Sequence, residues 1–119
     1  MKVKVRVKAR GSRPGKGLAL LELWAHVSKV QFEWDAAKAA SNLAKHGVTF
    51  DQGSRVFTDP AHVTVADTRH TTEVRENATG LVAGVILLTV THTNRAGVTR
   101  LISARRASRK ERNTYHAAH

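Results

Sequence analysis

The fold is decided by residues 85–105, which read VILLTVTHTNRAGVTRLISAR. Two alternating runs, 85–92 and 98–105, flank a turn-rich segment at residues 94–97, a pattern that predicts two antiparallel strands. A period of two sends neighbouring side chains to opposite faces of a sheet. One face of the first strand is then rich in hydroxyls and ends in a guanidinium: Thr89, Thr91, Thr93 and Arg95. His92 falls on the other face with Ile86, Leu88 and Val90, which favours a packed histidine over a catalytic one.

The second strand alternates less cleanly. Ser103 and Arg105 fall on the same face as Leu101, which mixes polar and apolar residues. The spacing leaves the face of Arg100 open.

Outward from this pair, the other elements follow from capping and turn residues. Residues 31–34 alternate as a short strand, Asp35 is placed to cap a helix over 36–46, and Gly47 ends that helix. Thr49 and Gln52 have capping-box spacing for a second helix. Asp59-Pro60 ends it, and strands are expected at 62–66 and about 75–82. Ser108 and Glu111 form another capping-box pair ahead of a terminal helix.

This order of elements, β-α-α-β-β-β-β-α, predicts an α+β fold. Sequential strands joined by short turns indicate a small antiparallel sheet, with two N-terminal helices and one C-terminal helix segregated to one side. A chain of 119 residues suits one compact domain.

The first 29 residues differ in composition from the rest. Residues 2–29 hold eight basic side chains and one acidic one, a net of +7, against a net of +4 for residues 30–119. Glycines and Pro14 follow the alternating start at once. We therefore expect residues 1–29 to be a poorly ordered basic extension and residues 30–119 to be the domain. The apolar run 18–27 looks like a signal-peptide core, but it contains Glu22 and lacks a small-residue cleavage site. A cytoplasmic protein without a membrane span is expected.

The charge balance points to an anionic partner. The chain has 20 Lys and Arg against 9 Asp and Glu, a net of +11, which favours nucleic acid, an acidic protein or an anionic surface. It has no cysteine, and His116 and His119 lack convincing further ligands, so we expect no metal site. It also has no P-loop, dinucleotide fingerprint or nucleophile elbow, so no cofactor is expected.

Two segments have the residue types that a metal-free ribonuclease needs. His70, between Arg69 and Arg75, offers an imidazole for proton transfer to or from the RNA, and arginine forks stabilise charge on a phosphorane. A charged surface loop explains the same residues equally well. Seven basic residues crowd the end of the chain: Arg95, Arg100, Arg105, Arg106, Arg109, Lys110 and Arg112. Such density suits phosphate contacts.

The helix over 36–46 is ambiguous in the same way. Lys38, Asn42 and Lys45 share one face, which is either a solvated face or a binding stripe. His46 in the last turn has a simple explanation in the helix dipole.

Taken together, the motifs resemble a known family, the BrnT-like toxins of bacterial type II toxin–antitoxin systems. The resemblance spans about residues 30–115. Its opening signature is Phe32-x-Trp34-Asp35-x-x-Lys38-x-x-x-Asn42-x-x-Lys45-His46-Gly47-Val48-x-Phe50. The middle elements are Val56-Phe57-x-Asp59-Pro60, Asp67-x-Arg69-His70 and Arg75-x-x-x-x-Gly80. It closes with Thr93-x-Arg95 and Ile102-Ser103-Ala104-Arg105-x-Ala107-x-x-x-Glu111-Arg112.

The resemblance implies a RelE-like fold and a metal-independent endoribonuclease that inhibits translation. It implies a BrnA-type antitoxin as partner, whose ribbon-helix-helix region binds operator DNA, so that the toxin reaches the operator only through the antitoxin. The implied catalytic residues are His70, Arg75, Arg95 and Arg105. The implied RNA-binding residues are Lys45, His46, Ser103, Arg106 and Arg109.

This chain departs from the family pattern at residues 76–79, Glu-Asn-Ala-Thr, which are polar where an apolar strand is usual. A weakened strand is expected there, and residues 1–29 lie outside the resemblance. The alternative to an active toxin is a degenerate one, a non-enzymatic basic protein that binds nucleic acid or antitoxin.

Overall fold

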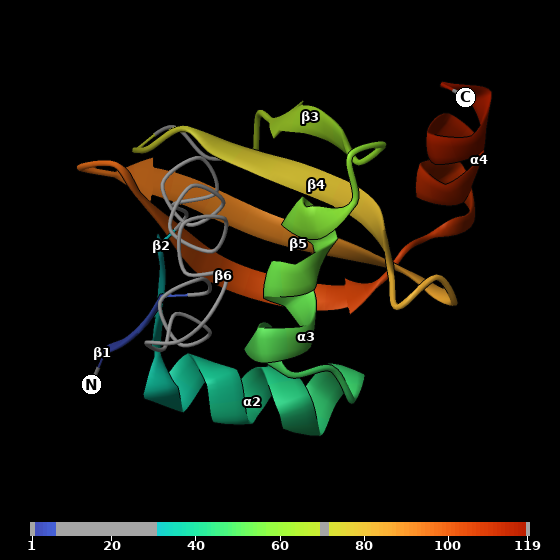
Figure 1. Cartoon of the computed structure of the whole chain (residues 1–119). Coiled ribbons are helices and arrows are strands. Elements are labelled where there is room, and N and C mark those ends of the chain that lie inside the picture. The colour runs from blue at the N-terminus through green and yellow to red at the C-terminus, as the bar shows by residue number, and fades with distance from the viewer. Residues whose placement is uncertain (1, 7–30, 70–71, 119) are drawn as a thin grey trace, which may run out of the picture.

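A computed structural model describes residues 2–6, 31–69 and 72–118; for residues 2–6 it describes the backbone only. One mixed sheet forms the centre, with its strands in the order β1-β2-β6-β5-β4-β3 (Figure 1). The strands are β1 (Lys2–Arg6), β2 (Gln31–Asp35), β3 (Val63–Asp67), β4 (Arg75–Val82), β5 (Ile86–Arg95) and β6 (Val98–Arg106). The helices are α2 (Ala36–His46), α3 (Phe50–Ser54), the 3-10 helix η2 (Arg55–Thr58) and α4 (Arg109–Ala117). The α+β class predicted from the sequence is confirmed.

The expectation of a purely antiparallel sheet is wrong at one pair of strands. β3, β4, β5 and β6 follow one another through short connections and pair antiparallel, as expected. β2, however, lies parallel to β6, with Phe32 opposite Thr99 and Glu33 opposite Arg100. Short turns fix only the direction of consecutive strands, and 62 residues separate β2 from β6 in the sequence.

Strand β1 adds a sixth strand at the edge of the sheet. Lys2–Arg6 pair antiparallel with β2, with Val3 opposite Trp34 and Val5 opposite Phe32. The alternation in this segment was noted from the sequence but was not counted as a strand. Residues 7–30 lie outside the described residues, so the division at residues 29 and 30 stays a prediction.

The helix boundaries follow the caps identified in the sequence. The Asp35 carboxylate accepts hydrogen bonds from the backbone N–H groups of Ala37 and Lys38, which starts α2. Gly47 ends it with φ of 71°, a left-handed conformation that favours glycine. Both capping boxes, Thr49 with Gln52 and Ser108 with Glu111, are formed.

The core lies between one face of the sheet and helices α2, α3 and η2. Its buried residues come from both layers: Phe32, Trp34, Val48, Phe50, Val56, Ala78, Val82, Leu88, Val90, Leu101 and Ala104. Gly53 of α3 packs so closely that an added Cβ would lie 2.9 Å from the Ala104 Cβ. His92 faces this core, as predicted, with its ring centroid 4.9 Å from that of Phe57.

Two side chains bind backbone groups at the sheet's open edges. Beyond the short stretch paired with β2, Asn42 of α2 takes the place of a neighbouring strand: its Nδ2 donates to Ala104 O at 2.8 Å and its Oδ1 accepts from Ala104 N at 3.1 Å. On β4, the Asp59 carboxylate accepts from Leu81 N at 2.8 Å. The sequence left the face shared by Lys38, Asn42 and Lys45 open between a solvated face and a binding stripe; Asn42 belongs to neither, since it is 6% exposed and bonds to the β6 backbone.

A β-bulge explains the irregular alternation of β6. Thr91 lies opposite Ser103, but the next residue, His92, lies opposite Leu101, so that Ile102 is an extra residue. The shift puts Leu101 in the core while Ser103 and Arg105 stay on the opposite face. Arg100, left open from the sequence, lies opposite Thr93 and so joins that opposite face.

Strand β4 is complete despite its polar sequence at residues 76–79. It runs over eight residues and pairs with β3 and β5 throughout its middle.

In the part of the chain that the structure describes, no helix is long and apolar enough to cross a membrane.

Candidate functional site

The face of the sheet opposite the core is lined by polar side chains, and we call it the polar face. Strand register places them there from five strands: Glu33; Asp67; Arg75, Asn77 and Thr79; Thr89, Thr91, Thr93 and Arg95; Arg100, Ser103 and Arg105. The hydroxyl-rich face predicted for β5 is thus confirmed, and the β4 and β6 neighbours extend it. Helix α4 lies at the end of this face near the β4–β5 hairpin (Figure 1).

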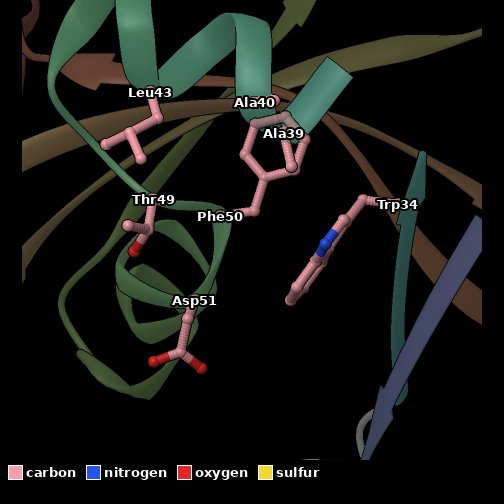
Figure 2. A pocket seen from close by; sticks show the side chains of 7 residues that line it. All are labelled: Trp34, Ala39, Ala40, Leu43, Thr49, Phe50 and Asp51. Carbon is pink, nitrogen blue, oxygen red and sulfur yellow. The ribbon is translucent and has the colours of Figure 1, made fainter. Parts of the chain in front are cut away.

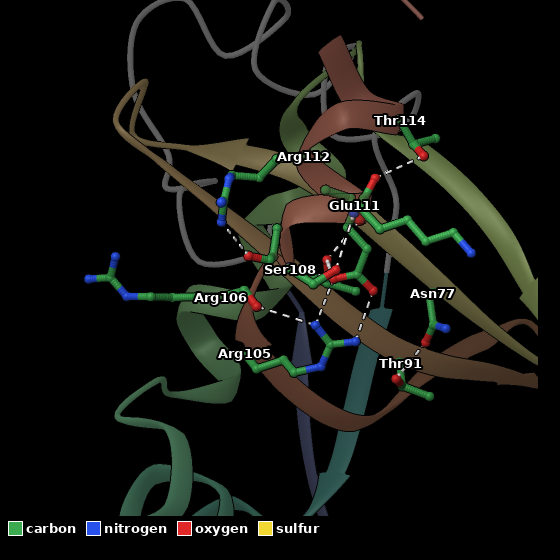
Figure 3. Close-up of polar contacts among 12 residues, drawn as sticks. Asn77, Thr91, Arg105, Arg106, Ser108, Glu111, Arg112 and Thr114 are labelled. Atoms are coloured by element: carbon green, nitrogen blue, oxygen red, sulfur yellow. Dashed lines mark hydrogen bonds and ion pairs between the residues drawn. The ribbon is translucent and has the colours of Figure 1, made fainter. Parts of the chain in front are cut away.

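At the α4 end, Glu111 binds Arg105 through two hydrogen bonds (Figure 3). Arg105 Nη1 donates to Glu111 Oε1 at 2.7 Å, and Nη2 donates to Oε2 at 2.9 Å. Glu111 Oε1 also accepts from Thr89 Oγ1 at 3.0 Å and from Ser108 N at 2.8 Å. The Thr79 hydroxyl, 2.7 Å from that of Thr89, continues the chain of hydrogen bonds onto β4. One carboxylate therefore caps α4 and orients an arginine of the sheet.

These contacts set the charge state of the pair. The Arg105 guanidinium is the main cause that lowers the pKa of Glu111 from 4.5 to about 2, with help from the Ser108 N–H and the Thr89 hydroxyl against the opposing effect of burial. The same contact raises the pKa of Arg105. Glu111 is thus a fixed anion at neutral pH and a poor proton acceptor in catalysis.

At the other end of the polar face, Glu73 bridges two arginines. Its Oε2 accepts from Arg75 Nε at 3.0 Å and its Oε1 from Arg95 Nη2 at 3.0 Å. The hydrogen bond from Arg95 is the first cause, and that from Arg75 the second, that lowers the pKa of Glu73. The Arg95 side chain remains 49% exposed, so the pair is open to an incoming anion.

Between the two ends, the hydroxyls of β5 bond within the protein. Thr91 Oγ1 donates to Asn77 Oδ1 at 2.6 Å, as Figure 3 shows, and Thr93 Oγ1 donates to Val74 O at 2.6 Å. Both threonines are buried. They therefore hold the strands in register and position the groups around them.

The structure brings Arg75 and Arg95 together and keeps Arg105 apart. Arg105 lies opposite Thr89, whereas Arg75 precedes Glu76, the residue opposite His92. Arg75 therefore lies beside Thr93, which is four positions from Thr89 on β5, about 13 Å along the strand. The polar face thus carries two arginine–carboxylate clusters, Arg105 with Glu111 and the Arg75–Glu73–Arg95 group, of which the second has a net positive charge.

Ser103 lies opposite Thr91 in the middle of the polar face, between the two clusters. Arg100 closes the β2 side of the face in a buried ion pair, with its Nη1 3.3 Å from Glu33 Oε2. Arg100 therefore stabilises the fold and is not counted among the candidate phosphate-binding residues.

The other residues implied in RNA binding are exposed but do not lie on the polar face: Arg106 is opposite the core residue Leu88, and Lys45 and His46 belong to α2, which covers the core side. Arg106 and Arg109 are exposed at the junction of β6 and α4. Lys45 and His46 are exposed at the end of α2, the helix that Asn42 fixes along the open edge of β6. Among the described residues, no carboxylate forms an ion pair with any of these four side chains.

The two histidines that the sequence singled out have different outcomes. His70, the first candidate for proton transfer, lies outside the described residues. His92 is buried in the core, where burial lowers its pKa despite the nearby Glu76, and its Nε2 has no hydrogen-bond partner among the described residues.

Sequence reasoning missed the role of both carboxylates. Glu73 lies two residues before Arg75, a spacing that places both on one side of an extended chain, and this signal was available. Glu111 was explained by its capping box, which is correct but incomplete. No local pattern reveals that Arg105 reaches the same oxygens.

Among the described residues, no three His, Asp or Glu side chains gather as a metal-binding group.

The fold and the site define a small α+β protein. The polar face of its sheet carries, at each end, arginine side chains that are bound by a carboxylate. Residues 34–111 match the family described as the ribonuclease toxin, BrnT, of type II toxin–antitoxin systems. The match covers well over half of the chain, and the protein belongs to this family. Membership implies an RNA substrate and an antitoxin partner.

Among solved structures, the chain is similar to the crystal structure of the Brucella abortus ribonuclease toxin, BrnT. The two are 25% identical, the match covers 64% of this chain and 94% of that one, and the TM-score is 0.48. No curated protein matches the chain.

Proposed function

We propose that the protein is a metal-independent endoribonuclease that inhibits translation in the cytoplasm by cleaving RNA. A BrnA-type antitoxin with a ribbon-helix-helix region holds it inactive and carries it to operator DNA. The observation that supports the proposal most directly is the strand register. It puts Arg75, Arg95 and Arg105, from three different strands, on one face of the sheet.

The chemistry uses the ribose as its own nucleophile. A base removes the proton of the 2′-hydroxyl, and the 2′-oxygen attacks the phosphorus. The P–O5′ bond then breaks as the leaving oxygen takes up a proton. The products are a 2′,3′-cyclic phosphate and a 5′-hydroxyl. Arginine forks stabilise the extra negative charge of the phosphorane, which no metal ion is then required to neutralise.

His70 is the candidate for proton transfer in this proposal, and Arg75 and Arg95 are the candidates for binding the scissile phosphate. His70 follows Arg69 in the connection between β3 and β4, and Arg75 begins β4. Arg105 would bind a neighbouring phosphate at the α4 end of the polar face. The exposed cations Lys45, Arg106 and Arg109, together with His46 and Ser103, extend the surface that an RNA strand contacts.

The carboxylates set how tightly each cluster binds a phosphate. Because the Arg95 side chain is half-exposed, a phosphate can compete with Glu73 for this guanidinium. Glu111 is held by four hydrogen bonds and holds Arg105 in one orientation. A phosphate binds this guanidinium at the edge that Glu111 leaves open.

The test is cleavage of a defined RNA by purified protein in EDTA. We expect cleavage with 2′,3′-cyclic phosphate ends, and no cleavage where the nucleotide 5′ of the scissile bond is 2′-deoxy. Arg105→Ala should lose cleavage while remaining folded by circular dichroism. Arg55→Ala is the matched control, because Arg55 also pairs with a carboxylate, Asp51, but lies away from the polar face on η2. Full activity of Arg105→Ala would remove this residue from the mechanism.

The second candidate is a degenerate toxin that binds RNA or antitoxin without cutting. It is favoured by the carboxylate partners of Arg75, Arg95 and Arg105, which lower the charge available to a phosphate. This candidate predicts salt-sensitive RNA binding with the RNA intact after long incubation. The same assay in EDTA and in Mg²⁺ decides between the two.

A further inference from the structure

A groove between the β4–β5 hairpin and the β6–α4 junction has the features of a peptide-binding surface. Its volume is about 330 Å³, in the range of small ligand sites. Leu81 and Leu87 line it on the hairpin side, and Arg106, Arg112 and His116 line it on the side of β6 and α4. We call it the cationic groove.

Val85 stands at the lip of this groove without a structural reason to be apolar. It follows a tight turn in which Ala83 and Gly84 have φ of 55° and 67°, and its side chain is 82% exposed. Because Val85 adjoins the apolar side chains that line the groove, an apolar side chain of a partner could pack against it and against them together.

The charged wall of the groove is not neutralised within the described residues. Arg112 is held by a hydrogen bond from its Nη1 to Ala107 O at 3.0 Å, which leaves its remaining N–H groups for a partner. No ion pair involves Arg106 or Arg112 among the described residues, in contrast to Arg75, Arg95 and Arg105 on the polar face. Carboxylates of a binding partner could form ion pairs with Arg106 and Arg112.

We propose that the cationic groove binds a segment of the antitoxin that inserts an apolar side chain beside Val85 and places acidic residues against Arg106 and Arg112. The proposal rests on the proposed toxin function, in which such a partner exists. A peptide fits better than RNA, because none of the described residues that line the groove is Phe, Tyr or Trp, the rings on which bases stack. A second copy of this chain is disfavoured by its net charge of +11.

Docking at this groove explains how a partner would inhibit the enzyme. Arg106 belongs to the groove and to the surface proposed for RNA. Arg105, its neighbour in the sequence, is held by Glu111 at the start of the same α4 helix. A bound acidic segment would therefore compete with RNA for Arg106, beside the α4 end of the polar face.

A second apolar hollow on the same chain provides a control site for testing the cationic groove. It lies between α2 and α3, is lined by Trp34, Leu43 and Phe50, and has a volume of about 250 Å³ (Figure 2). Its charged lining residue is the acidic Asp51, which pairs with Arg55. Leu43 at its edge is 48% exposed, so Leu43→Glu provides a matched control for a charge placed at an apolar lip.

The experiment measures binding and neutralisation by the protein encoded in the adjacent reading frame. Val85→Glu should weaken its binding about tenfold or more and release RNA cleavage from inhibition, because the new carboxylate repels the acidic segment. Val85→Lys also removes the apolar contact but adds a cation that attracts the acidic segment, so it should weaken binding less. Leu43→Glu should bind as the wild-type chain does. All three variants should cleave RNA alone at the wild-type rate.

The outcomes separate this inference from the proposed function. Intact RNA with the wild-type chain alone would contradict the ribonuclease proposal. A wild-type chain that cleaves RNA, together with a Val85→Glu variant that is neutralised equally well, would contradict docking at the cationic groove. Loss of neutralisation in Leu43→Glu alone would move the partner to the α2–α3 hollow, and slower cleavage by Val85→Glu without partner would assign the groove to RNA.

Discussion

Glu111→Gln separates the two roles of the carboxylate that binds Arg105. The glutamine amide keeps an oxygen that can accept from Ser108 N and Thr89, but it loses the negative charge that pairs with the guanidinium. We therefore expect α4 to stay capped while the ion pair is lost. The variant isolates the electrostatic part of the contact.

The size of the effect follows from the pKa of Glu111. A carboxyl whose pKa falls from 4.5 to about 2 on folding would contribute about 3 kcal/mol at 1.36 kcal/mol per unit. The side chains of Glu111 and Arg105 are 22% and 32% exposed, so solvent screening reduces this figure. We expect Glu111→Gln to lower the free energy of unfolding at pH 7 by about 1–2 kcal/mol.

The pH dependence gives the same prediction a second test. The pKa of Glu111 is lower in the folded chain, so its contribution is complete above about pH 4.5 and is lost as the pH falls toward 2. The wild-type chain and Glu111→Gln should differ in stability at pH 7 and converge near pH 2.

Urea denaturation followed by far-ultraviolet circular dichroism measures the difference at each pH. Asp51→Asn is the control, because Asp51 pairs with Arg55 where both side chains are more than 60% exposed, and its effect should stay below about 0.5 kcal/mol. Equal stability of Glu111→Gln and wild type at pH 7, or a constant difference down to pH 2, would refute the reasoning.

Two further substitutions test the contacts at the sheet's open edges: one changes Asn42, which binds the β6 backbone, and the other changes Tyr115, which holds the edge-binding Asp59. Asn42→Ala should cost about 2–4 kcal/mol in urea denaturation, because it leaves the N–H and C=O of buried Ala104 without their partner; Asn113→Ala, exposed on α4, should have little effect. A small loss for Asn42→Ala would mean that water replaces the amide. Tyr115→Phe removes the hydroxyl that donates to Asp59 Oδ2 at 2.6 Å and should cost about 1–2 kcal/mol; unchanged stability would show that this bond does not fix α4.

The Tyr115→Phe variant also has a pH signature. Burial raises the pKa of Asp59, but the hydrogen bonds from Tyr115, Leu81 N and Ala61 N outweigh it and leave the pKa lowered. The stability that these bonds give is present above the ordinary carboxyl range and is lost in acid. Removing the Tyr115 hydroxyl should therefore reduce the loss of stability on acidification, as urea denaturation at pH 7 and pH 3 would show.

Elements whose signals lie within a few residues could be predicted from the amino-acid sequence. The caps of α2, α3 and α4, and the alternation of β5, depend on contacts between residues at most four apart or on the period of the strand. Short-range geometry of this kind is fixed wherever the segment sits in the fold. The period of two therefore suffices to place Thr89, Thr91, Thr93 and Arg95 on one face.

The tertiary structure alone decided which distant groups meet. The bulge at Ile102 arises from how β5 and β6 pair, and it sets the faces of Arg100 and Leu101 that spacing left ambiguous. The parallel pairing of β2 with β6, the contact of Asn42 with Ala104 and the binding of Arg105 by Glu111 depend on register and packing. Such contacts form because a buried backbone group or charge requires a partner, and the choice among partners is made only when the whole chain is packed.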